Sequence, residues 1–430
     1  MKTVRELKIE RDNLEENPVI PFEMFGIRPT YEKIGYEQVK VFKNSIQNAI
    51  LLLTKHPNWE GKIKLNEWAN VVYINGEQIE DYTVLDIIYQ IAGLYGVDFS
   101  KSTILDATCY VAKQNPYNPF REYIEGIKLT PEQRQNPVLD RWLVDCFGVE
   151  DKEIFRVYGR KWAIGNIARS LFSTLQNPIQ HDLALLFYGP QGAGKSTALR
   201  TLAIKTEWFS DIPIDMTKTR EAAIKLQGVF IYELKELAKR AGIEAEKAFI
   251  DTRIDKYRPM YGKTDVRHVR RTNIAASTNF DTIFRDSSGS RRWLAVAVGK
   301  INTAELSKIV DQLWAEALEA YLEGIKNKTP CLWWLTEQED ELRKEEAERF
   351  TTVHPWKHKI KTWIQGGHIS IEGVNYPVSP TKIMERLELP SNMQNKKTLN
   401  QIGYILNELG WFKRRVWVED GTRPTRWIET

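Results

Sequence analysis

The sequence contains little cysteine and no long apolar run. Its three cysteines, Cys109, Cys146 and Cys331, are far apart and form no C-x-x-C pair. This argues against a zinc site or a disulfide framework and favours a reducing, cytoplasmic compartment. No stretch of eighteen apolar residues occurs, and the N-terminal segment lacks the apolar core of a signal peptide. We therefore expect neither secretion nor a membrane span, and no membrane partner.

Net charge of one sign is also scarce. The chain has 61 Lys and Arg residues against 57 Asp and Glu residues, a formal net charge of +4. Binding to nucleic acid would therefore have to rest on local basic patches, because the bulk charge is too small. No internal repeat or low-complexity segment is present. A hydrophobic content of 42% is enough for packed cores, and 430 residues allow two or three domains.

A phosphate-binding loop is the most specific feature that the sequence does contain. Residues 189–197 read G-P-Q-G-A-G-K-S-T, which matches G-x-x-x-x-G-K-[ST] and lies between an apolar run and a helical pattern. The glycines let successive N–H groups point at an anion, the lysine adds a positive charge, and the serine can hold Mg²⁺. We therefore predict a nucleoside triphosphate and Mg²⁺ here. The expected binding residues are Gly189, Gln191, Gly192, Ala193, Gly194, Lys195, Ser196 and Thr197.

A carboxylate is expected on a neighbouring strand, where it would hold Mg²⁺ and polarise the attacking water. In the run V-F-I-Y-E-L-K-E-L at 229–237, four apolar residues end in Glu233, and Glu236 follows one turn later. The segment lacks the usual Asp-Glu pair. Glu233 is the better candidate for both the metal and the catalytic role, and Glu236 is the second. Either carboxylate could instead cap or salt-bridge a helix.

Two further polar groups fit phosphoryl transfer. Asn279 follows the apolar strand pattern at 273–277, where its amide could orient water or contact the γ-phosphate, although asparagine is also common in turns. Arg291 and Arg292 precede another apolar strand. One of them could stabilise the transition state in a neighbouring subunit's site. The alternative for these arginines is a structural salt bridge to Asp286 or Glu233.

Two basic segments are candidates for DNA contact. The segment 256–271 interleaves basic and aromatic residues, and Lys263 and Arg267 lie on a predicted hairpin that could contact backbone phosphates. A solvated loop is the alternative. A second group lies near the C-terminus and could serve protein contacts as well as DNA: Lys396, Lys397, Lys413, Arg414 and Arg415.

Hydrophobic periodicity divides the chain into regions. Alternating strand and helix patterns at 181–330 predict an α/β core with a largely parallel sheet. A helix, a helix and a hairpin at 375–430 are typical of a winged helix. The expected organisation is an arm at 1–35, an all-helical domain at 36–180, the ATPase core at 181–330, a helical connector at 331–374 and the winged helix at 375–430.

Several motifs occur in an order that resembles the virulence-associated protein E family over residues 36–365. They include W-F-S-D at 208–211, S-T-N at 277–279 and G-S-R-R-W at 289–293, together with the phosphate loop and the Glu233 strand. The family comprises P-loop ATPases of phages and phage-like mobile islands, related to superfamily 3 and D5-type replicative helicases. The resemblance implies an AAA+-like core with a helical collar, a pore hairpin and an arginine acting in trans.

The resemblance also implies a function. It points to an ATP-dependent DNA helicase or translocase that forms a ring, expected to be a hexamer, in the cytoplasm of a bacterial host. Single- and double-stranded DNA and host or phage replication proteins are the expected partners. One alternative is an origin-binding initiator whose ATPase drives assembly without processive unwinding. Another is a small-molecule kinase or GTPase, although Asn395-Lys396-Lys397-Thr398 lacks the aspartate of a guanine-reading N-K-x-D motif.

Overall fold

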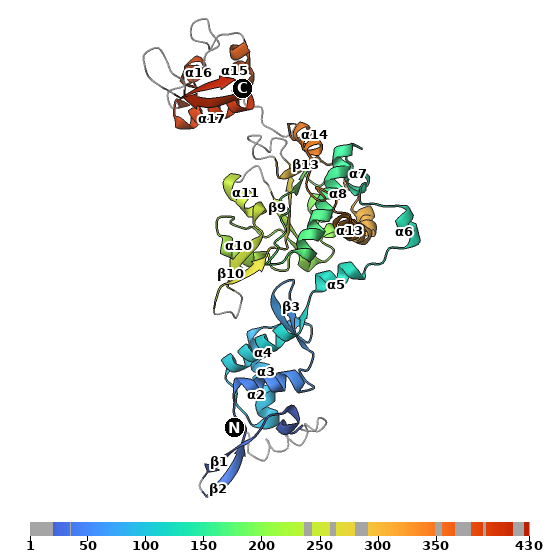
Figure 1. Ribbon diagram of the computed structural model, residues 1–430, viewed down its shortest axis with the longest axis vertical. Coiled ribbons are helices and arrows are strands. Elements are labelled where there is room, and N and C mark those ends of the chain that lie inside the picture. Colours follow the sequence, from blue (N-terminus) through green and yellow to red (C-terminus); the bar gives the residue numbers. More distant parts are fainter. Residues whose placement is uncertain are drawn as a thin grey trace.

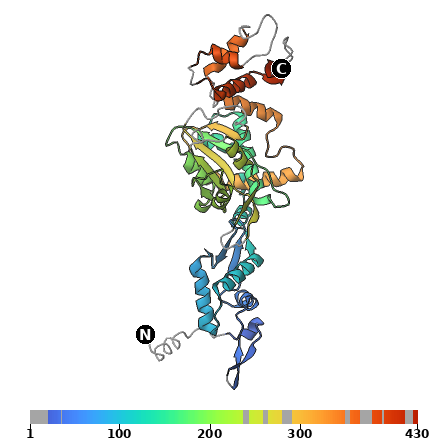
Figure 2. The ribbon, with the colours of Figure 1, turned by 90° about the vertical axis from the view of Figure 1, so that its left-hand side faces the viewer.

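The computed structural model describes residues 20–34, 36–235, 243–258, 264–279, 291–348, 355–365, 380–389, 393–415 and 425–429. Its described parts follow one another along a long axis (Figures 1 and 2). N-terminal elements occupy one end, an α/β body lies in the middle, and the last helices and strands occupy the other end. Among the described helices, none combines the length and the apolar character that a membrane crossing requires.

The N-terminal part combines helices with short strands. Its elements are η1 (Phe22–Phe25), β1 (Thr30–Ile34), β2 (Glu37–Val41), α2 (Ile46–Lys55), β3 (Ile63–Asn66), β4 (Val71–Ile74), β5 (Glu77–Gln78), α3 (Asp81–Tyr95), α4 (Lys101–Gln114) and β6 (Pro116–Tyr117). The strands form the sheet β5-β4-β3-β6 and the separate hairpin β1–β2. The expectation of an all-helical region at 36–180 is therefore wrong.

A tight turn between β4 and β5 explains why this region forms strands. Asn75 and Gly76 both have positive φ, at 55° and 85°. An Asn-Gly pair in this conformation is a strong signal for a tight hairpin. Side chains alternate along β4, where Val72 and Ile74 are buried between half-buried neighbours. This alternation with period two is the pattern of a strand with one buried face.

The central body is built on a five-stranded parallel sheet. Its strands are β7 (Ala184–Tyr188), β8 (Phe209–Ser210), β9 (Ile231–Lys235), β12 (Asn273–Thr278) and β13 (Trp293–Ala297). They are ordered β13-β7-β12-β9-β8, and every neighbouring pair is parallel. The predicted α/β core with a parallel sheet is confirmed. The long apolar runs follow from burial on both faces of the sheet.

Helices cover both faces of this sheet, as Figure 1 shows. The helices of this central body are α5 (Pro119–Gly126), α6 (Pro131–Gln135), α7 (Trp142–Phe147), α8 (Glu153–Ile167), the π-helix η2 (Ala168–Phe172), α9 (Lys195–Leu202), the 3-10 helix η3 (Thr206–Trp208), α10 (Thr219–Lys225), α11 (Ile243–Asp251) and α13 (Thr303–Lys326), of which α6 projects away from the sheet (Figure 1). Residues of α8, α9 and α13 share one hydrophobic cluster with one sheet face. Residues of α10 and α11 share another cluster with the opposite face. Most helices from 119–172 thus pack on the sheet, although they precede the predicted boundary at residue 180.

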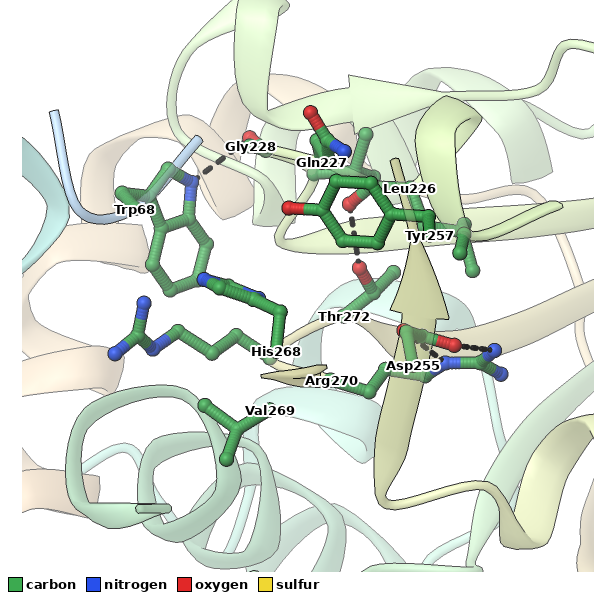
Figure 3. A pocket seen from close by; sticks show the side chains of 13 residues that line it. Trp68, Leu226, Gln227, Gly228, Asp255, Tyr257, His268, Val269, Arg270 and Thr272 are labelled. Atoms are coloured by element: carbon green, nitrogen blue, oxygen red, sulfur yellow. Dashed lines mark hydrogen bonds and ion pairs between the residues drawn. The ribbon is translucent and has the colours of Figure 1, made fainter. Parts of the chain in front are cut away.

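A short turn joins the N-terminal sheet to the central body. Trp68, which lies between β3 and β4, is 2% exposed, and its indole N–H donates to the carbonyl of Gly228 at 2.8 Å, as Figure 3 shows. Asn70 donates to the hydroxyl of Tyr257 at 2.9 Å. Tyr257 belongs to the antiparallel hairpin of β10 (Ile254–Tyr257) and β11 (Val266–Val269). The turn therefore contacts both the start of the Glu233 strand and this hairpin.

The C-terminal elements form a core of their own. They are α15 (Pro355–Gln365), α16 (Pro380–Arg386), α17 (Lys396–Glu408), β14 (Trp411–Arg415) and β15 (Thr425–Glu429). The preceding helix, α14 (Glu337–Glu348), packs on the central body, where Ala347 belongs to the same cluster as α10 and α11. Ile360 of α15 packs with Ile383 of α16 and Ile402 of α17. The order of α16, α17 and the antiparallel pair β14–β15 agrees with the expected helix, helix and hairpin. Their identity as a winged helix stays a prediction.

Candidate nucleotide site

The phosphate-binding loop connects β7 to α9. Gly189 follows β7 directly, and a Cβ at this position would lie 2.7 Å from the carbonyl oxygen of Val298. Gly192 and Gly194 have φ of +82° and +94°, a backbone conformation that favours glycine. Helix α9 then begins at Lys195. The three glycines therefore allow the tight turn that directs the loop toward the N-terminus of α9, a position suited to an anion.

Lys195 lies at the centre of the site. Its side chain is 8% exposed, and its ammonium donates to the carbonyls of Gly189 at 2.7 Å and Pro190 at 2.9 Å. A third hydrogen bond goes to Oδ1 of Asn279 at 2.7 Å. Burial lowers the pKa of Lys195 below its ordinary value, and the nearby Glu233 carboxylate opposes this shift. The structure thus brings together two residues, Lys195 and Asn279, that were singled out separately in the sequence.

Glu233 faces the loop from β9. It is 1% exposed, and its Oε1 accepts hydrogen bonds from the hydroxyls of Ser196 at 2.7 Å and Ser277 at 2.5 Å. Its Oε2 is also buried and has no hydrogen-bond partner among the described residues. A buried carboxylate oxygen without a partner is costly, so its position fits a group that arrives with the nucleotide.

The oxygen ligands around this point fit Mg²⁺. Mg²⁺ is usually bound by one or two protein carboxylates or hydroxyls together with substrate phosphates. The Ser196 hydroxyl and the Glu233 carboxylate supply such oxygens side by side. Within the described residues there is no group of three or more His, Cys, Asp or Glu side chains arranged to hold a metal without a substrate. The donor set therefore suits a cation that is held jointly with a nucleotide.

Lys195, Ser196 and Asn279 border a cavity of about 400 Å³ at the carboxyl edge of the sheet, and Glu233 contacts two of its lining residues, Ser196 and Ser277. Its lining is Gln191, Gly192, Ala193, Gly194, Lys195, Ser196, Thr197, Lys235, Ser277, Thr278 and Asn279. The chain leaves β7 for β8 at one side of the sheet and later returns to β13 on the other side of β7. Ligands of open α/β sheets bind at such a switch point, outside the carboxyl ends of the strands. The topology and the cavity thus agree on the location of the site.

The sequence analysis assigned no role to three residues at this edge, Lys235, Asp211 and Ser277. Lys235 lines the cavity, and its ammonium lies 2.5 Å from the carboxylate of Asp211, just after β8. Ser277 contacts Glu233 directly. The period of two along a strand was the available signal: Lys235 lies two residues beyond Glu233, and Ser277 lies two residues before Asn279.

The two predicted arginines lie at the opposite edge of the sheet. The carbonyl of Arg292 accepts from the amide of Ala184 at the start of β7, so the pair is about 16 Å from the phosphate loop, the length of a five-residue strand. Arg292 is 5% exposed, and its Nε donates to Asp251 at 2.6 Å. Arg291 is exposed. Neither residue therefore reaches the phosphate loop of its own chain. Among the described residues Arg292 forms a salt bridge with Asp251, whereas the predicted partner Asp286 lies outside the described residues.

The predicted DNA-contacting residues fall into two separate places. Arg267 is exposed on β11, directly opposite Lys256 of β10. Lys396 is exposed at the start of α17, which also contains Lys397, and the triplet at 413–415 lies in β14. Figure 1 places the C-terminal elements at the far end of the molecule from the β10–β11 hairpin. Lys263 and Glu236 lie outside the described residues.

Solved structures with low sequence identity are similar to this chain. The apo structure of the NrS-1 C-terminal region (305–718) is 12% identical, with a TM-score of 0.40, and the match covers 85% of this chain and 95% of that one. An A-form apo structure of the same region is 14% identical, with a TM-score of 0.42 and coverages of 90% and 100%. The X-ray structure of the JCV helicase is 14% identical, with a TM-score of 0.23 and coverages of 62% and 79%. No match was found among curated proteins.

The sequence itself matches one family. The sequence model of the virulence-associated protein E-like domain matches residues 128–352, which is more than half of the 430 residues. The matched range contains the phosphate-binding loop and every predicted catalytic residue. The resemblance inferred from the motifs is therefore confirmed, and the chain belongs to the virulence-associated protein E-like family.

Proposed function

We propose that this protein is an ATP- and Mg²⁺-dependent DNA helicase or translocase that forms a ring and acts in the replication of a phage or phage-like mobile element. The observation that carries the proposal is the arrangement of Lys195, Ser196 and Asn279 around one cavity at the switch point of a parallel sheet, with the Glu233 carboxylate hydrogen-bonded to Ser196. Membership in the virulence-associated protein E-like family supports the replication setting.

Each residue of the site has a chemical role in this proposal. Lys195 and the loop amides bind the phosphates of ATP, and Ser196 and Glu233 hold Mg²⁺. When bound, the ion neutralises charge on the phosphates. Glu233 accepts the proton of the attacking water at Oε2, the oxygen without a partner among the described residues. Asn279 contacts the terminal phosphate or orients the water.

The proposed ring is supported by the position of the arginines. An arginine that lies about 16 Å from its own phosphate loop can act only on the nucleotide of a neighbouring subunit. Arg291 is the better candidate because it is exposed, whereas Arg292 is held by Asp251. A head-to-tail interface of this kind closes into a ring when the rotation permits, and we expect a hexamer.

Two surfaces contact DNA in this proposal. The β10–β11 hairpin places Lys256 and Arg267 side by side, and like charges in this arrangement repel each other unless an anion lies near them. With Lys263, they would contact the backbone of single-stranded DNA in the pore. The winged helix at 375–430 would bind duplex DNA through the basic residues of α17 and β14, and replication proteins are further partners.

Nucleotide binding and hydrolysis test the site. Lys195→Ala is expected to abolish ATP binding, whereas Glu233→Gln should bind a fluorescent ATP analogue normally but hydrolyse ATP at least a hundredfold more slowly. Glu337→Gln, an exposed glutamate at the start of α14, serves as the matched control and should behave as the unaltered protein. Normal hydrolysis by Glu233→Gln would refute the assignment.

Strand separation decides between the helicase and the initiator. The unaltered protein should unwind a forked duplex in the presence of ATP, and single-stranded DNA should stimulate hydrolysis. Hydrolysis with origin binding but without unwinding would favour the initiator. Hydrolysis that DNA does not affect would favour a small-molecule kinase or GTPase. Deletion of residues 375–430 should weaken duplex binding and leave basal hydrolysis intact.

A further inference from the structure

The Glu233 carboxylate accepts a hydrogen bond from Ser277, a residue to which no role has been assigned. Ser277, at the carboxyl end of β12, donates its hydroxyl to Oε1 of Glu233 at 2.5 Å and is 7% exposed. Ser196 donates to the same oxygen at 2.7 Å. A hydrogen bond to an ionised carboxylate is short and strong, and two donors on one oxygen fix the rotation of the carboxylate. Both donors lie on Oε1, so Oε2 is the oxygen left for the reaction.

The register of the sheet explains why Ser277 can reach the carboxylate. Residues that are in register on parallel strands point to the same face, and Ala275 pairs with Glu233 while Ser277 pairs with Lys235. The methyl group of Ala275 leaves space beside the carboxylate. Ser277, two residues further along β12, then contacts the carboxylate diagonally. A larger side chain at position 275 would occupy this space.

The hydroxyls of Ser196 and Ser277 belong to different parts of the structure. Ser196 belongs to the loop and helix that bind phosphate, so its position depends on the ligand in the site. Ser277 belongs to a strand that is paired on both sides, with β7 and with β9. Its position is therefore set by the sheet and does not depend on the nucleotide. Ser277 is the donor that can keep the carboxylate oriented throughout a cycle of binding and hydrolysis.

We propose that Ser277 is a positioning residue for hydrolysis: it fixes Oε1 of Glu233 so that Oε2 faces the attacking water. The inference rests on the proposed function, because it assigns to Glu233 the role of general base. A general base acts only within hydrogen-bond reach of the proton that it removes, so a carboxylate that can rotate loses part of its rate effect. The hydroxyl of Ser277 is expected to matter for turnover and not for nucleotide binding.

The test compares variants of the full-length protein. Ser277→Ala should lower the kcat for ATP hydrolysis by about ten- to a hundredfold, a fraction of the effect of a general base. KM for ATP and the affinity for a fluorescent ATP analogue, with and without Mg²⁺, should change less than threefold. Ser277→Thr, which keeps the hydroxyl, should restore most of the activity. Ser210→Ala, which alters another buried serine of the same sheet, is the matched control and should leave kcat unchanged.

A double-variant cycle separates this inference from the proposed function. In the Glu233→Gln background, Ser277→Ala should cause no further loss, because Ser277 acts through Glu233. If Glu233→Gln is inactive while Ser277→Ala hydrolyses ATP at the normal rate, the positioning role is refuted and the proposed function is not. Additive losses in the double variant, or a fall in nucleotide affinity that matches the fall in kcat, would also refute the role. Ser277→Cys, a near-isosteric replacement with a weak donor, gives the same comparison if the alanine variant does not fold.

Discussion

The buried ion pair at the base of the β10–β11 hairpin allows a quantitative prediction. Arg270 and Asp255 are 3% and 8% exposed, and Arg270 Nε donates to Asp255 at 2.9 Å, with a second hydrogen bond from its Nη2. Nη1 donates to the carbonyl of Phe249 at 2.6 Å. Figure 3 shows the pair on the opposite side of a pocket from Trp68. Arg270→Met would remove the cation and leave a buried carboxylate unpaired, at a cost of about 3–5 kcal/mol in the free energy of unfolding.

The double variant Arg270→Met/Asp255→Leu should be more stable than Arg270→Met alone. It removes both charges, so only the carbonyl of Phe249 is left without this donor, at a cost of about 1–3 kcal/mol. Urea unfolding followed by tryptophan fluorescence measures both values, since Trp142 and Trp162 are buried in the central body. Arg134→Met removes an exposed ion pair to Glu319 and should leave the urea midpoint unchanged. A double variant as unstable as the sum of its single variants would refute the reasoning.

Three further predictions concern the site and its partners. Gly189→Ala would place a Cβ 2.7 Å from the Val298 carbonyl oxygen, so the loop must shift. The affinity for a fluorescent ATP analogue should therefore fall at least tenfold. An unchanged affinity would contradict the loop geometry. A mixture of Arg291→Ala and Lys195→Ala subunits should regain part of the ATPase activity, because some hybrid interfaces contain both intact residues. The absence of rescue in complexes shown to contain both subunits would argue against an arginine in trans. Arg267→Ala should reduce the salt dependence of single-stranded DNA binding by about one unit of slope while basal hydrolysis is retained, and an unchanged slope would exclude a phosphate contact.

The predicted parts of the nucleotide site were those in which local sequence determines the geometry. The loop at 189–197 needs glycine where φ is positive, so its residues identify it without knowledge of the fold. Glu233 and Asn279 were predicted because each follows an apolar run, and parallel strands bring their carboxyl ends to one edge. The contact between Lys195 and Asn279 spans 84 residues and depends on the strand order, which no local pattern contains.

The salt bridge of Arg292 and the N-terminal sheet could not be predicted from hydrophobic periodicity. The salt bridge of Arg292 goes to Asp251, which is 41 residues away and lies at the end of α11, so its choice of partner is set by tertiary packing. The N-terminal sheet was missed for a different reason. Its strands are only two to four residues long between longer helices, and the helical periodicity of the flanking segments dominated the prediction. The Asn75-Gly76 turn was the local signal that could have identified it.

The hairpin and the catalytic edge are two ends of one continuous segment. Only residues 270–272 separate β11 from β12, and each is held by a buried or partly buried hydrogen bond. Arg169 donates to the carbonyl of Arg270 at 3.2 Å, Ser170 donates to that of Arg271 at 2.9 Å, and Thr272 donates to Leu226 at 2.9 Å. Arg169 and Ser170 belong to η2 and Leu226 follows α10, so these bonds hold the 270–272 linker to the central body, and displacing the linker would cost about 1–3 kcal/mol for each group left unpaired. Moving the hairpin together with β12 would break the same bonds, and also the pairing of β12 with β7, the strand that leads into the phosphate loop. The linker and β12 are therefore fixed to the same body, which holds the base of the hairpin in a set position relative to Ser277 and Asn279.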